Sequence, residues 1–129
     1  MLNAKSILSL SIFIIFKLIY TVSTFSRTRQ GNTLFNMRVC FNKKYCSAPG
    51  RGIEDITLRN IAYTGEAPNM GIIAGYDESR KVKNIRFENF TINGKLISDD
   101  MTGKPKWYKT ADMANIYVND HVENVTFSK

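Results

Sequence analysis

Apolar and polar residues alternate in three similar segments of this 129-residue chain. The segments are IEDITLRNI at 53–61, VKNIRFENF at 82–90 and VENVTF at 122–127. They share one order: apolar, any, Asp or Asn, apolar, any, apolar, any, Asn, apolar, and the third stops before its second Asn. A period of two with β-branched and aromatic residues predicts strands with one buried face. Recurrence at separations of 29 and 40 residues indicates stacked structural units.

The alternation changes phase at Asn60 and again at Asn89, because the next apolar residue, Ile61 or Phe90, comes three positions on instead of two. One residue must turn a corner there, and Asn tolerates the left-handed backbone conformation that a corner needs. Stacked units would place the two Asn side chains above one another, so that their amides bond in a ladder.

Short strands, sharp corners and an apolar interior predict an all-β fold. We expect a right-handed, single-stranded parallel β-helix of about three coils over residues 51–129. The alternative is a small antiparallel sandwich, but that fold does not require a repeated Asn at the corner. Gly71–Gly75 and Ala114–Val118 predict short buried strands between the repeats, Asn93-Gly94 predicts a tight turn, and residues 98–110 form the longest excursion.

An apolar run, SILSLSIFIIFKLIYTV, occupies residues 6–22 and comes directly after Lys5. It predicts a secretory signal peptide or an uncleaved N-terminal anchor over residues 1–23, with a third interpretation that this stretch is unrelated to the rest of the chain. Residues 24–50 carry no repeat and are expected to be an irregular basic linker. The chain is therefore expected outside the cell or at its surface, with membrane contact only through residues 1–22 if they are retained.

The net charge of +7 is unevenly distributed. Residues 1–51 carry eight Lys or Arg and no acid, whereas residues 52–129 carry ten bases and eleven acids. Nucleic-acid binding requires a basic face on the folded part, so we exclude it. Cys40, Cys46 and the single His121 are too few and too scattered for a metal site. We expect no metal and no cofactor, and the two cysteines are either unpaired or joined in a small loop.

Three longer segments resemble the C-terminal coils of polygalacturonase-like β-helix proteins, the family 28 glycoside hydrolases. They are RGIEDITLRNIAYTG, IIAGYDESRKVKNIRFENFTINGKLISD and NIYVNDHVENVTF. The resemblance covers residues 50–129 and nothing before them. Members of that family hydrolyse α-linked galacturonan with inversion, which needs one carboxylic acid to protonate the leaving oxygen and one carboxylate to activate water.

The family's catalytic motifs are Asn-Thr-Asp, Asp-Asp, Gly-His-Gly and Arg-x-Lys, and none can be carried over to this chain. Asn32-Thr33 is followed by Leu34, Asp99-Asp100 comes after a tight turn near the end, His121 has no flanking glycine, and Arg80-Lys81 has the wrong spacing. The resemblance therefore implies a C-terminal fragment of a pectin-degrading hydrolase without catalytic acids of its own. The alternative is a non-catalytic carbohydrate-binding or surface-adhesion module.

One loop in the long excursion combines cations with adjacent aromatic rings: Lys104, Lys106, Trp107, Tyr108 and Lys109. Aromatic faces stack on sugar rings and lysines complement uronate carboxylates, so this loop is the candidate site for an acidic, pectin-like polysaccharide. The plainer interpretation is that both rings pack over the strands while the lysines stay solvated. Because the third segment stops before its corner, we also expect an uncapped end capable of self-association.

Overall fold

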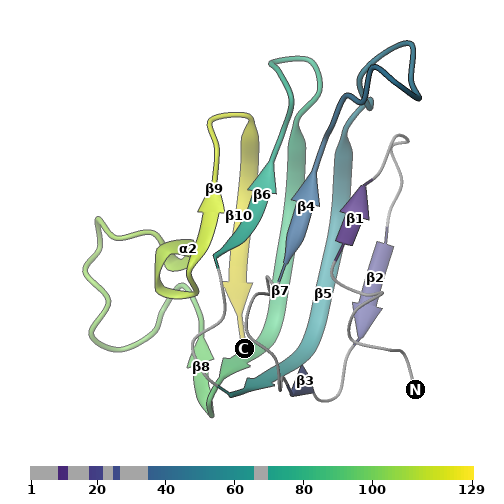
Figure 1. Cartoon of the computed structure of the whole chain (residues 1–129). Helices are drawn as coiled ribbons and strands as arrows, with labels where there is room; N and C mark the ends of the chain where they lie inside the picture. Colours follow the sequence, from purple (N-terminus) through teal and green to yellow (C-terminus); the bar gives the residue numbers. More distant parts are fainter. Residues whose placement is uncertain (1–8, 12–17, 22–24, 27–34, 66–69) are drawn as a thin grey trace.

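The computed structural model describes residues 9–11, 18–21, 25–26, 35–65 and 70–129. These residues form strands, turns and a single short helix, α2 (Thr110–Met113). The expected all-β class is confirmed. The strands belong to two sheets that lie opposite one another (Figure 1), and neither sheet closes on itself in the described part of the chain.

The larger sheet has six strands. Its main path runs in the order β10-β7-β5-β2. Its members are β2 (Leu18–Thr21), β3 (Phe25–Ser26), β5 (Ile53–Thr64), β7 (Val82–Ile92), β8 (Lys95–Ile97) and β10 (Val122–Ser128). All pairings are parallel except that between β7 and β8, which are joined by the tight turn expected at Asn93-Gly94, where both residues have positive φ.

The smaller sheet has four parallel strands in the order β1-β4-β6-β9. They are β1 (Ser9–Ser11), β4 (Asn36–Arg38), β6 (Gly71–Ala74) and β9 (Ile116–Val118). The chain alternates between the sheets, running from β4 to β5, from β6 to β7 and from β9 to β10. The expected strands at Gly71–Gly75 and Ala114–Val118 are thus present as β6 and β9, paired with each other.

The three repeated segments are parallel neighbours in the larger sheet. Ile56 pairs with Ile85, and Ile85 with Val125; Leu58 pairs with Phe87 in the same register. Equivalent apolar residues therefore lie side by side from strand to strand. The antiparallel sandwich alternative is wrong for these strands.

The corners are where the change of phase predicted them. Asn60 has φ 57° and Asn89 has φ 53°, and the Asn89 amide donates to the Asn60 side-chain oxygen at 3.0 Å. The predicted amide ladder is confirmed. Because each left-handed residue turns the strand, Ile61 and Phe90 still face the interior, and both are buried.

A second ladder occupies the third position of the repeat, and we had not predicted it. The Asn84 amide donates to the Asp55 carboxylate at 3.0 Å, and the Asn124 amide donates to the Asn84 oxygen at 2.8 Å. All three residues have positive φ. The Asp or Asn shared by the three segments at this position was the available indication in the sequence.

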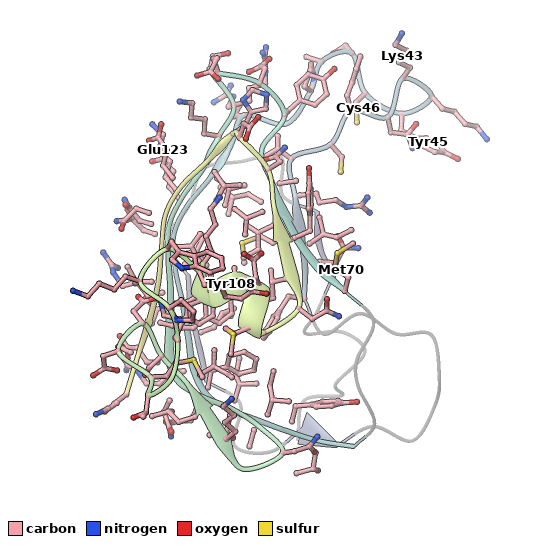
Figure 2. All side chains as sticks on the ribbon, turned by 90° about the vertical axis from the view of Figure 1, so that its left-hand side faces the viewer. Lys43, Tyr45, Cys46, Met70, Tyr108 and Glu123 are labelled. Atoms are coloured by element: carbon pink, nitrogen blue, oxygen red, sulfur yellow. The ribbon has the colours of Figure 1, made fainter. Side chains whose placement is uncertain are left out.

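The core lies between the two sheets, as Figure 2 shows from the side. Phe87 and Phe127 stack in parallel with ring centroids 4.6 Å apart. Phe35, at the entry to β4, meets Phe87 edge-on at 5.1 Å and Phe90 at 5.4 Å. Aromatic rings from both sheets thus interlock in one interior, which ties the sheets together.

The expected irregular linker over residues 24–50 needs correction. Residues 36–38 are strand β4, which pairs with β6, and Phe35, Met37 and Val39 are buried, Met37 to 2 % exposure. Their alternation in the sequence FNMRV was a strand pattern too short to stand out. Residues 40–50 are irregular as expected, with a turn at 43–45.

Most of the segment for which a signal peptide or anchor was expected, residues 1–23, lies outside the described residues. Its described parts are β1, which pairs with β4, and β2, which pairs with β5. Within the described residues, no helix has the length and apolar character needed to cross a membrane.

Candidate functional site

The excursion between β8 and β9 covers one end of both sheets. We call residues 98–113 the cap segment. Figure 1 shows it beside β9 and β10, on the side away from β6 and β7. Hydrogen bonds within the segment hold its turns: the Tyr108 backbone N–H donates to the Pro105 carbonyl at 3.0 Å, and Lys104 Nζ donates to the Tyr108 carbonyl at 3.0 Å.

All five residues predicted to bind carbohydrate line one pocket of about 380 Å³ between the cap segment and the edge strands. These are Lys104, Lys106, Trp107, Tyr108 and Lys109. Asp99 and Thr110 lie on the same wall, and α2, β9 and β10 contribute Ala111, Val118, Val125 and Phe127. The structure therefore brings the predicted loop together around a single cavity.

The two aromatic rings of the loop differ in exposure. Trp107 is 81 % exposed, whereas Tyr108 is half-buried. Their rings meet edge-on, with centroids 5.7 Å apart and planes at 78°. The plainer interpretation, in which both rings pack over the strands, thus fits Tyr108 but not Trp107. A large exposed indole beside a pocket is available to a ligand.

The pocket has an excess of positive charge. Lys104 is half-buried, and its ammonium group donates a hydrogen bond to the neutral carbonyl of Tyr108. Lys106 and Lys109 are exposed. Among the ion pairs of the described residues, none involves these three lysines. Asp99 is the carboxylate on the pocket wall, so an anionic ligand would meet uncompensated cations.

Asp99 fixes the cap segment to the edge of the larger sheet. Its carboxylate accepts a hydrogen bond from the Thr110 hydroxyl and another, of 2.9 Å, from the Phe127 backbone N–H. Its own backbone N–H donates to the Phe127 carbonyl at 3.0 Å. The strand end expected to be uncapped is therefore covered at Phe127, the position where an added strand would otherwise bond.

The neighbouring Asp100 has a different role. It accepts from the Ser98 hydroxyl at 2.6 Å and lies 3.6 Å from Lys129 Nζ. The Ser98 hydrogen bond, helped by the Lys129 charge, lowers the pKa of Asp100 from its usual value. Both aspartates thus serve the turn, as the sequence position after the β7–β8 hairpin indicated, and the lowered pKa of Asp100 is the opposite of the raised pKa that a general acid needs.

The other acidic pair, Asp77 and Glu78, belongs to the turn between β6 and β7. Asp77 accepts from Ser79 and Arg80. Glu78 lies 3.0 Å from Lys81 Nζ and 3.1 Å from His121 Nδ1. The Lys81 hydrogen bond and charge lower the pKa of Glu78. A carboxylate held in its charged form is unsuited to protonating a leaving group at neutral pH.

Cys40 and Cys46 are both free thiols and half-buried, the unpaired alternative left open by the sequence. Within the described residues, no group of three His, Cys, Asp or Glu side chains is placed to hold a metal ion.

No family model, no curated protein and no solved structure matches this chain. The resemblance to polygalacturonase-like proteins therefore rests on the repeated segments alone.

Proposed function

We propose that the paired sheets are coils of a right-handed parallel β-helix of the polygalacturonase-like kind. Two features support the proposal: the parallel in-register pairing of β5, β7 and β10, and the Asn ladder at a left-handed corner in consecutive units. Parallel in-register pairing is what a β-helix requires, because each coil must return the chain to the same position one strand further on, and the Asn ladder marks the corner that repeats from coil to coil.

We infer that these coils bind an acidic, pectin-like polysaccharide and do not hydrolyse it by themselves. The observation that carries this inference is the 81 % exposed ring of Trp107 at one pocket, beside three lysines that have no carboxylate partner in the described part of the chain. The indole presents a flat apolar face to a sugar ring, and the ammonium groups attract uronate carboxylates. In a hydrolase of the proposed family, such coils would contribute substrate binding.

The hydrogen bonds and pKa shifts of the turn carboxylates support the proposed lack of catalysis. Inverting hydrolysis needs two carboxyl groups facing each other across a water and a sugar, one of them with a raised pKa. Asp99 has both oxygens occupied by Thr110 and Phe127, and Asp100 and Glu78 have lowered pKa values. Hydrolysis by these coils would need carboxylates from elsewhere.

Fluorescence titration with oligogalacturonate tests the binding proposal, since Trp107 is the only tryptophan. We expect a saturable change at millimolar ligand or below, weakened by added salt because exposed charges are screened. A neutral oligosaccharide of the same length should bind more weakly. No change at millimolar oligogalacturonate would refute the proposal.

Charge variants locate the site. Lys106→Gln and Lys109→Gln should each weaken oligogalacturonate binding several-fold, about 0.5–1 kcal/mol per exposed charge. Lys95→Gln is the matched control, because Lys95 is an exposed lysine of β8 outside the pocket lining. An equal loss from all three substitutions would indicate non-specific attraction.

A reducing-sugar assay on polygalacturonate tests the absence of catalysis, and we expect no release above buffer. Release that disappears in Asp99→Asn or Asp100→Asn would show that the turn aspartates are catalytic, contrary to the proposal.

We also propose that the protein acts outside the cell or at its surface, on the basis of the apolar run at 6–22. Intact-mass measurement of the mature chain is the test. Loss of about the first 23 residues would support export with cleavage, and a retained segment would favour the anchored alternative or its inclusion in the sheets.

A further inference from the structure

The pocket beside the cap segment has two chemically distinct parts. Its rim carries the lysines and the exposed indole, whereas its floor is made by Ala111, Val118, Val125 and Phe127. Ala111 and Phe127 are buried, and Val118 and Val125 are half-buried. The two valines come from edge strands of opposite sheets, β9 and β10, so the floor is the open end of the apolar interior.

This floor is poorly suited to a bare sugar. Sugar hydroxyls lose hydrogen bonds to water when they are buried, and burial is favourable only if protein groups replace those bonds. The nearest carboxylate, Asp99, already accepts from Thr110 and from Phe127. An apolar group would instead cover the two valines without leaving any polar group unpaired.

We propose that the pocket recognises an acidic saccharide carrying an aryl or acyl substituent, with the substituent on the apolar floor. This inference rests on the proposed function and specifies its ligand. The uronate ring lies against Trp107, its carboxylate faces Lys106 and Lys109, and the substituent reaches Val118 and Val125. Small-molecule sites have this composition, mostly apolar with a few polar groups that fix orientation, and the volume of about 380 Å³ lies in their usual range.

Charge decides between this ligand and a neutral apolar glycoside. Three lysines at the rim have no carboxylate partner among the described residues, and the one acidic group on the wall is engaged in hydrogen bonds. A neutral aryl glycoside would fill the floor but leave these cations without a counter-charge. An anionic saccharide satisfies both parts of the pocket.

The test compares three probes on the full chain by NMR titration: phenyl β-D-glucuronide, methyl β-D-glucuronide and phenyl β-D-glucoside. We expect the phenyl glucuronide to bind about tenfold more tightly than the methyl glucuronide, the equivalent of burying a few carbon atoms. It should shift the methyl resonances of Val118 and Val125 together with the Trp107 indole resonance. The neutral phenyl glucoside should bind several-fold more weakly than the phenyl glucuronide.

A floor variant provides the second measurement. Val125→Thr keeps the side-chain shape but places a hydroxyl on the floor, and should reduce the preference for the phenyl over the methyl probe about three- to tenfold. Val122→Thr is the matched control, because Val122 is a half-buried residue of the same strand outside the pocket lining. Comparison of thermal unfolding shows whether either variant is unfolded.

The possible outcomes distinguish this inference from the proposed polysaccharide binding on which it rests. Equal affinity for phenyl and methyl glucuronide, with oligogalacturonate still bound, overturns the substituent pocket and leaves polysaccharide binding intact. Failure of oligogalacturonate as well overturns both. Tight phenyl binding that leaves Val118 and Val125 resonances unchanged places the ligand elsewhere, and also overturns the inference.

Discussion

The side-chain amide of Asn84 donates a hydrogen bond of 3.0 Å to the carboxylate of Asp55, a residue 29 positions earlier in the chain. Both residues adopt a left-handed backbone, with φ of 55° and 57°. Each residue therefore has two roles: it adopts a backbone conformation that most residues avoid, and its side chain bonds to the equivalent residue of the adjacent strand.

Substitution of Asn84 separates these two roles. Asn84→Gly keeps the left-handed backbone at no steric cost but loses both ladder bonds, and should lower the free energy of unfolding by about 1–2 kcal/mol. Asn84→Ala loses the bonds and adds backbone strain, so its loss should be about 1 kcal/mol greater. Urea unfolding of both variants measures the difference. Equal stability of the two would show that the backbone conformation carries no cost here.

Gly75 should tolerate no side chain. A Cβ atom there would lie 2.2 Å from the His121 carbonyl oxygen and 2.7 Å from the His121 Cβ. The backbone of Gly75 is also held from both sides, since its N–H and carbonyl both bond the Asn119 side chain. Gly75→Ala must push apart the β6–β7 and β9–β10 connections, and should cost about 2–3 kcal/mol of unfolding free energy.

The matched control for this clash is Gly103→Ala. A Cβ at Gly103 meets nothing within 4 Å, and the position has φ 82°. Its cost should be limited to backbone strain, about 1–2 kcal/mol. A larger loss at Gly103 than at Gly75, measured by the same denaturant unfolding, would contradict the argument from close approach.

The free energy of unfolding should decrease at acidic pH, because the carboxylates around Lys81 become protonated. Lys81 Nζ lies 2.6 Å from Glu123 and 3.0 Å from Glu78, and Glu78 also faces His121. The Lys81 hydrogen bond lowers the pKa of both glutamates. Their contribution is therefore present above the unfolded value of about 4.5 and is lost as pH falls through their lower folded values.

Lys81→Met should make the variant less stable than the parent chain at neutral pH, with the difference shrinking below about pH 4.5. Thermal unfolding between neutral and acidic pH measures it. Lys95→Met is the control, because Lys95 is exposed and takes part in none of the ion pairs of the described residues. A difference that persists unchanged into acid would show that Lys81 acts through packing and not through charge.

Asp99 should control both stability and association. Asp99→Ala removes the acceptor of the buried Phe127 N–H and of the Thr110 hydroxyl, with an expected loss of about 1–3 kcal/mol. It also frees the outer edge of β10, so sedimentation velocity should show more self-association with rising concentration. Asp100→Ala loses the Ser98 hydrogen bond and the exposed Lys129 contact but leaves Phe127 covered, so it should cost less stability than Asp99→Ala and leave association unchanged. A monomeric Asp99→Ala protein of unchanged stability would contradict the capping role.

The corners could be predicted from the sequence because the cause is local. A change of phase in the apolar pattern beside Asn60 and Asn89 requires a turn, and few residue types accept the left-handed conformation. The same reasoning extends to Asp55, Asn84 and Asn124, yet their place at the third position of the repeat was not recognised as a second row. The repeated Asp or Asn there was a sufficient indication.

The cap segment could not be predicted in the same way. Its attachment depends on Asp99 meeting Phe127, 28 residues later, and no periodic pattern links the two. The loop of lysines and aromatic residues was recognised by composition, but its apolar floor comes from Val118 and Val125 on other strands. Strand β4 was missed for another reason, because three residues of alternation are too few to distinguish a strand from a linker.

Both hydrogen bonds in the row of Asp55, Asn84 and Asn124 point in the same direction, toward the preceding repeat. Each asparagine donates a hydrogen bond from its amide N–H to the side-chain oxygen of the preceding member, and Asn84 also accepts one from Asn124, whereas an ionised aspartate can only accept. An ionised carboxylate therefore fits at the accepting end of this row, where Asp55 lies, but in place of Asn84 or Asn124 it could not donate the bond that each of them makes. Among the described residues, Asp55 therefore stands at the accepting end of this row and Asn124 at its donating end.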